Sequence, residues 1–170
     1  MVRFKNRWLL VEFIPCAPST APARPMSAKH IWAALKQSVI AHFGDVGWGA
    51  VGLSLTVKYY SPTTHVCIIR VAREQHRIAW GALTLLSSIE GQKYIPNMVH
   101  LSGTLPFFVF AENALMECGG TIKHAQLAAI RHNREVVGRL RARAKTPAAY
   151  QDSYEGYLES STAEIEALQD

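Results

Sequence analysis

The chain has 170 residues, of which 49% are hydrophobic, and this is enough to bury one core in a single domain with appendages. Its net charge of +5 is divided unevenly: residues 1–145 hold all 18 Lys and Arg with seven acids, whereas residues 146–170 hold six acids and no Lys or Arg. Short apolar runs and three widely spaced cysteines exclude a membrane-spanning protein, a zinc-finger framework and a disulfide scaffold. A basic body with an acidic tail favours a polyanionic partner, and the tail either shields that surface or binds another protein.

The first predicted element is a strand at residues 7–14, which begins directly after a run of alternating cations. Arg3, Lys5 and Arg7 occupy every second position, and an apolar run broken only by Glu12 follows them. Because side chains alternate along a strand, the three cations are expected on one edge or face beside an apolar body. This arrangement predicts a surface that is offered to something acidic.

A helix is expected next, beginning at Ser27 as its N-cap and ending at Gly44. Glycines within residues 47–52 then mark a turn. Residues 51–60 alternate apolar and polar side chains, which predicts a half-buried strand, and residues 64–72 predict its hairpin partner.

Four further elements complete the chain. They are a helix at residues 74–89, a strand at 98–101, a helix from 121 to 140, and a short acidic helix within 150–170. Strand, helix, hairpin, helix, strand is the order of the ferredoxin-like split βαβ sandwich, an antiparallel sheet with helices packed on it. The predicted class is therefore α+β, with a C-terminal helix and acidic tail added. This fold hosts many functions, so it does not define one.

No catalytic or metal-binding constellation is present in the sequence. His124 and His132, eight residues apart, are expected to share a helix face with no carboxylate beside them. The glycine-rich loop of acylphosphatases and the aromatic submotif of RNA-recognition motifs are both missing. Tyr59, Tyr60 and Trp80 are therefore expected to be core or partner contacts rather than base-stacking platforms. The chain is expected to bind rather than catalyse, with no cofactor or metal of its own.

Basic residues on the predicted sheet and helices indicate contact with a phosphate backbone, where each contact adds affinity through counterion release. Ordinary solubilising charge is the alternative, and residues 139–145 are equally consistent with a nuclear-import signal. The candidate RNA-binding residues are Arg3, Lys5, Arg7, Lys58, Arg73, Arg77, Lys123, Arg131 and Arg134.

Several stretches resemble the Pop-five type protein subunit of ribonuclease P and ribonuclease MRP. The N-terminal run is the specific one, and the later pieces support it jointly over most of residues 1–140. The stretches are Met1 to Leu10 with Glu12, Phe43-Gly44, Val57-Lys58-Tyr59, Ile69-Arg70-Val71, Trp80-Gly81-Ala82-Leu83, His100-Leu101-Ser102-Gly103-Thr104 and Thr121-Ile122-Lys123.

The resemblance implies a non-catalytic subunit of a ribonucleoprotein endonuclease that removes the 5′ leader from precursor tRNA, and of a related particle that cuts precursor rRNA. It implies that the RNA subunit performs hydrolysis with bound Mg²⁺. It also implies three protein partners: a barrel-type subunit, a related small ferredoxin-like subunit and a large scaffold subunit. The expected location is the nucleus and nucleolus, with no membrane partner. A module that only docks neighbouring subunits, without RNA contact, is the alternative, and an independent enzyme is a third possibility.

The expected organisation is an RNA-binding ferredoxin-like domain at residues 1–145 and an acidic tail at 146–170. In the family, Ser-Gly-Thr after the last strand runs directly into the helix, whereas here residues 105–120 separate the two. This stretch is either a lineage-specific insertion or a translated intron. Its four consecutive apolar residues, Phe107 to Phe110, need a core or a partner to cover them.

Overall fold

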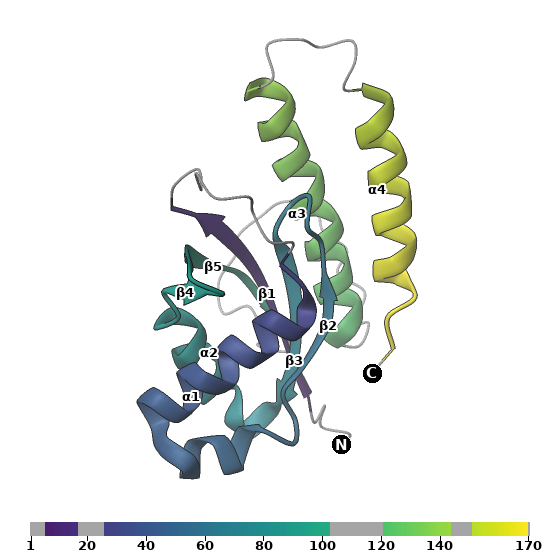
Figure 1. Ribbon diagram of the computed structural model, residues 1–170. Coiled ribbons are helices and arrows are strands. Elements are labelled where there is room, and N and C mark those ends of the chain that lie inside the picture. The colour runs from purple at the N-terminus through teal and green to yellow at the C-terminus, as the bar shows by residue number, and fades with distance from the viewer. Residues whose placement is uncertain (1–5, 17–25, 103–120, 144–150, 170) are drawn as a thin grey trace, which may run out of the picture.

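The computed structural model describes residues 6–16, 26–102, 121–143 and 151–169 (Figure 1). A five-stranded antiparallel sheet has the strand order β2-β3-β1-β5-β4, with two helices on each face. The elements are β1 (Asn6–Pro15), α1 (Ala28–Val51), β2 (Thr56–Tyr60), β3 (Val66–Ala72), the 3₁₀ turn η1 (Arg73–Gln75), α2 (His76–Thr84), β4 (Ser88–Ile89), β5 (Gln92–Ser102), α3 (Thr121–Arg143) and α4 (Gln151–Glu166). The expected ferredoxin-like class, including its C-terminal helix, is confirmed.

The central strand β1 is buried on both faces because helices cover both sides of the sheet. It pairs antiparallel with β3 and with β5. Leu9 and Val11 face the core beneath α1 and α2, whereas Trp8 and Leu10 face the core beneath α3 and α4. A strand of this kind has a nearly continuous apolar sequence, and this explains why β1 could be predicted from the sequence.

Small side chains bring α3 close to the sheet. Ala125 and Ala129 are almost fully buried against Trp8 and Leu10, and Ile165 of α4 joins the same cluster. The larger cluster on the other face contains Ile31, Leu35, Ala79 and Leu83 of α1 and α2. The protein therefore has three layers, with α1 and α2, the sheet, and α3 and α4 in succession (Figure 1).

Helix α1 extends beyond its predicted end. Gly44 has φ 68° and ψ −172°, which kinks the helix, but a further helical segment then continues to Val51. The predicted turn at residues 47–52 and the strand start at Val51 are therefore wrong, and β2 begins at Thr56. Val51 and Leu55 are both buried. Since a spacing of four fits both a strand and a helix face, this pair did not distinguish the two.

The predicted helix at 74–89 is also too long, because α2 ends at Thr84 and a short hairpin follows. Glu90 and Gly91, with φ of 50° and 77°, link β4 to β5. Two consecutive residues with positive φ are typical of a type I′ hairpin turn. Strand β5 starts at Gln92 rather than Met98, and Pro96 within it weakened the strand pattern.

Candidate nucleic-acid interface

Three predicted cations meet where β1 begins and β3 ends. Arg7 is paired with Val71 in the sheet register, so Arg73, two residues later, lies close by. Arg77 follows in the first turn of α2. We call Arg7, Arg73 and Arg77 the basic corner.

The guanidinium groups of Arg7 and Arg73 are close enough to repel one another. Partial burial, and secondly the charge of Arg73, hold the pKa of Arg7 below its ordinary value, although an arginine stays protonated. The ion pairs found among the described residues all involve Glu12 or His132, so no described carboxylate forms an ion pair with this corner. Like charges held together without counterions favour an anionic ligand.

A second group of predicted cations lies on α3, on the other side of the sheet. Lys123, Arg131 and Arg134 are all exposed, and Leu127 lies on the same outer side with 65% of its surface exposed. We call these three cations the α3 stripe. The predicted site residues therefore form two separate surfaces on opposite faces of the sheet.

Lys58, another of the predicted cations, joins neither surface. Lys58 lies on the edge strand β2, and its Nζ donates a hydrogen bond to the backbone oxygen of Gln169 at 3.3 Å. The structure thus places Lys58 beside the C-terminal segment. Arg3 and Lys5 lie outside the described residues.

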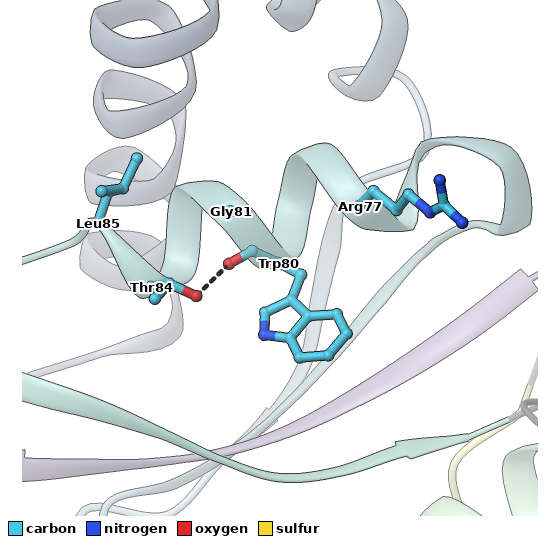
Figure 2. A pocket seen from close by; sticks show the side chains of 5 residues that line it. All are labelled: Arg77, Trp80, Gly81, Thr84 and Leu85. Atoms are coloured by element: carbon cyan, nitrogen blue, oxygen red, sulfur yellow. Dashed lines mark hydrogen bonds between the residues drawn. The ribbon is translucent and has the colours of Figure 1, made fainter.

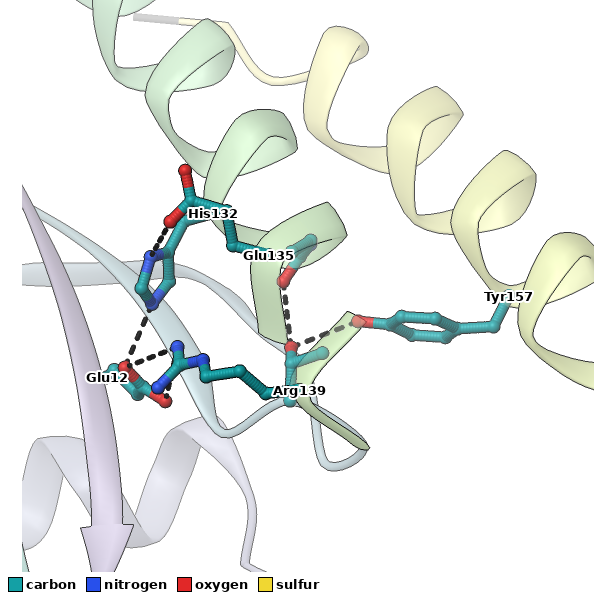
Figure 3. A network of polar contacts seen from close by, with 7 residues as sticks. Glu12, His132, Glu135, Arg139 and Tyr157 are labelled. Atoms are coloured by element: carbon teal, nitrogen blue, oxygen red, sulfur yellow. Dashed lines mark hydrogen bonds and ion pairs between the residues drawn. The ribbon is translucent and has the colours of Figure 1, made fainter. Parts of the chain in front are cut away.

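A buried ionic cluster fixes the rotation of α3 (Figure 3). Glu12 of β1 is only 7% exposed, and its carboxylate contacts His132 Nε2 at 2.9 Å and Arg139 Nη2 at 3.3 Å. A buried carboxylate needs such partners because isolated burial of a charge is costly. With His132 turned inward, the neighbouring Arg131 and Arg134 are left on the solvent side.

The expectation that His132 has no carboxylate beside it is wrong. Its partner Glu12 comes from a distant strand, and spacing within the helix carries no signal of such a contact. For Glu12 the one available sequence signal was the single acid in the apolar run of β1. Since both faces of β1 are covered, that acid had to meet a polar group from a helix. A second carboxylate, Glu135, lies three residues after His132 in the same helix and 3.8 Å from its Nδ1, and helix spacing could have indicated this neighbour.

A second polar network docks α4. The Tyr157 hydroxyl reaches from α4 to Ser61 Oγ at 2.6 Å and Thr64 Oγ1 at 3.0 Å, which belong to the loop between β2 and β3. Asn133 of α3 accepts a hydrogen bond from Thr64 Oγ1 at 2.8 Å and donates to Ser161 Oγ of α4 at 2.9 Å. Hydrogen bonds among buried groups of this kind fix one arrangement of α3, α4 and the hairpin.

The end of α4 is held as well. Gln126 Nε2 of α3 donates to the backbone oxygens of Ile165 and Leu168, at 2.8 and 3.2 Å. These bonds satisfy carbonyls that a helix end leaves without partners. The acidic side chains of α4 that the structure describes all remain exposed: Glu155, Glu159, Glu164 and Glu166.

A shallow groove of about 390 Å³ runs along α2 (Figure 2). It is lined by Arg77, Trp80, Gly81, Thr84 and Leu85, and we call it the α2 groove. Trp80 is 43% exposed, so of the two expected roles, core or partner contact, it does not have the first, whereas Tyr59 is a core residue as expected.

The described part of the chain offers little for catalysis. Burial raises the pKa of the Cys67 thiol, which disfavours the reactive thiolate. No cluster of three or more His, Cys, Asp or Glu side chains suited to a metal ion occurs in this part. None of the helices that the structure describes is long and apolar enough to cross a membrane. The arrangement is suited to binding polyanions through two basic surfaces.

A ferredoxin-like α+β domain with an added helical layer and two basic outer surfaces is thus the class that the fold and site define. Residues 7–107 match the model of the Rpp14/Pop5 family, and the chain belongs to this family. The predicted resemblance is confirmed.

Curated relatives support the assignment over most of the chain. The ribonuclease P/MRP protein subunit POP5 of Schizosaccharomyces pombe is 37% identical over 147 residues, which cover 81% of this chain and 91% of the relative. The subunit of the same name from Danio rerio is 30% identical over 167 residues, covering 95% and 88%. A probable POP5 subunit of Arabidopsis thaliana is 37% identical over 109 residues, covering 62% and 72%.

Proposed function

We propose that this chain is a non-catalytic protein subunit of ribonuclease P and ribonuclease MRP that binds their RNAs. Its family and the names of its relatives support the subunit role. The observation that supports direct RNA contact is the pair of exposed basic surfaces, whose cations have no ion-pair partner among the described residues.

Two separated surfaces suit a protein that supports RNA folding. The basic corner and the α3 stripe lie on opposite faces of the sheet, so each is available to a different RNA segment. Neutralising phosphates reduces repulsion between packed RNA helices and releases counterions. In this proposal the RNA holds the Mg²⁺ and carries out the hydrolysis that matures precursor tRNA and precursor rRNA, and the particle works in the nucleus and nucleolus.

Exposed apolar residues support the further proposal of protein partners. Val46 and Leu53 are 87% and 102% exposed, and Phe43 is 38% exposed near the kink of α1. A partner that covers them would remove apolar surface from water. The proposed partners are the barrel-type subunit, the related small ferredoxin-like subunit and the large scaffold subunit. A docking module without RNA contact is the second candidate, and these apolar residues are the observation that favours it.

The deciding experiment is to tag the chain, purify it in mild salt from its source cell and sequence the RNA that co-purifies. We expect enrichment of the ribonuclease P and MRP RNAs, together with 5′-leader cleavage activity in the eluate. Recovery of protein partners without these RNAs would contradict the proposal and favour the docking module. Binding of the purified chain to ribonuclease P RNA, measured against salt, then tests direct contact.

A further inference from the structure

We propose that the α2 groove binds an unpaired nucleotide, whose base stacks on Trp80 and whose phosphates lie at the basic corner. This inference rests on the proposed function, because it names the kind of RNA segment that one basic surface receives. The ligand class is single-stranded or looped-out RNA, and not duplex.

The first step concerns what Trp80 does in the fold. The inward face of α2 is formed by Ala79, Ala82 and Leu83, all of which are essentially buried. Trp80 instead lines an open groove with 43% of its surface exposed. Contact between a large apolar side chain and water is unfavourable in free energy. A ligand that covers the Trp80 ring removes this contact.

The second step concerns the shape of the groove. Gly81 lies at the middle of its lining and carries no side chain, and Phe43 of α1 lies against this glycine, where an added Cβ would be 2.8 Å from Phe43 Cζ. Thr84 Oγ1 already donates to the Trp80 backbone oxygen at 2.9 Å (Figure 2). The groove therefore presents flat apolar surface rather than a set of polar groups that select one base. This suits stacking, which tolerates any base.

The third step concerns charge. Arg77 lines the same groove three residues before Trp80, about 4.5 Å along the helix axis. Arg73 and Arg7 lie beyond it, and no described carboxylate pairs with any of the three. An aromatic ring beside cations matches a nucleotide, which has a π-face and a phosphate, better than it matches an apolar protein surface. Bases inside a duplex cannot reach such a ring, and this is why the segment must be unpaired.

Stacking and phosphate contacts respond differently to salt, so the two can be separated. Trp80→Ala in the full chain should weaken binding to ribonuclease P RNA by about 5- to 150-fold, the loss expected for one stacked base. Its salt slope should stay unchanged, since stacking releases no counterion. Arg77→Ala should weaken binding and also flatten the slope by about 0.7 to 0.9.

Two controls guard against effects on folding. Trp80→Phe keeps an aromatic face and should retain most of the affinity. Ile95→Ala removes an exposed apolar side chain from β5, away from both basic surfaces, and should leave RNA affinity unchanged. In the intact particle, ultraviolet crosslinking should attach a nucleotide to the tryptic peptide spanning residues 78–93, which contains Trp80.

The results distinguish this inference from the proposed function. Unchanged affinity of Trp80→Ala with no nucleotide on the 78–93 peptide overturns the inference while wild-type RNA binding stands. If Trp80→Ala causes the particle to lose a protein subunit while RNA affinity is intact, the groove binds a protein. That result also overturns the inference. If the unsubstituted chain binds ribonuclease P RNA with no salt dependence, the proposed function itself fails and the inference fails with it.

Discussion

His132 Nε2 lies 2.9 Å from a carboxylate oxygen of Glu12, a residue 120 positions earlier in the chain, and both side chains are buried. Because a carboxylate only accepts, Nε2 must carry the proton in this contact. The pair joins the central strand to the helix that carries the α3 stripe. The geometry of one basic surface therefore depends on a contact that is itself hidden from solvent.

Breaking this pair should destabilise the protein strongly. Glu12→Ala leaves His132 without its buried partner, and we expect the free energy of unfolding to fall by about 3–5 kcal/mol, as for other broken buried pairs. Urea unfolding measures this. Glu135→Ala is the matched control, since that carboxylate is 61% exposed and lies 3.8 Å from His132, and it should change stability by less than about 0.5 kcal/mol. A small effect of Glu12→Ala would show that the contact does not hold α3.

The sequence predicted the elements whose burial is one-sided or complete, and it missed contacts between distant residues. Strands β1 and β3 were recognisable because continuous apolar runs reflect burial on both faces. The lone acid in the apolar run of β1 indicates a polar partner on a helix, but nothing in the sequence indicates that this partner is His132. The same holds for Tyr157 and Ser61, whose contact docks α4 through hydroxyl groups that are equally common on protein surfaces.

Replacing glycine with alanine should have opposite effects on stability at two positions of α1, Gly44 at the kink and Gly49. At Gly44, with φ 68° and ψ −172°, Ala should destabilise the fold by about 1–3 kcal/mol because that backbone region is essentially restricted to glycine. Gly49 is in the same helix with open space around it, so Ala there should stabilise by about 0.5–1 kcal/mol. Thermal unfolding of the two variants measures both effects. Equal shifts in the same direction would contradict the assigned backbone.

The basic corner should control the salt dependence of RNA binding. Replacing Arg7, Arg73 and Arg77 with Ala should lower affinity for ribonuclease P RNA and flatten the plot of log affinity against log salt by about one unit per lost phosphate contact. Lys93→Ala removes an exposed cation from β5 and serves as the control, with little change in slope expected. If the triple variant has the same salt slope as the unsubstituted chain, the basic corner does not contact RNA phosphates. The same comparison for Arg3 and Lys5 tests the remaining N-terminal cations.

Acid should weaken the fold through two histidines. Burial lowers the pKa of His100, with a further contribution from nearby His124, and burial lowers the pKa of His65, opposed by the charge of Glu12. The unfolded chain then binds protons that the folded chain does not, so stability falls as the pH drops below about 6.5, the ordinary pKa of histidine.

Urea unfolding at pH 7.5 and pH 5.5 measures this loss. His100→Gln should reduce the difference in unfolding free energy between the two pH values, because it removes one of the shifted groups. His65→Asn is the suitable second variant, since His65 has φ 55° and Asn tolerates that backbone region. If both variants show the same difference in unfolding free energy between pH 7.5 and pH 5.5 as the unsubstituted chain, the acid sensitivity comes from other groups.

The docking of α4 has a consequence for how this protein meets a nucleic acid. Four carboxylates are held outward on the α4 side, while the cations of the basic corner lie at the start of β1 and α2. The carboxylates of α4 share a layer with the α3 stripe, so they lower the positive potential around that stripe, whereas the basic corner lies on the opposite face of the sheet. The attachment of α4 thus makes the two basic surfaces unequal, and we expect a polyanion to be drawn first to the basic corner.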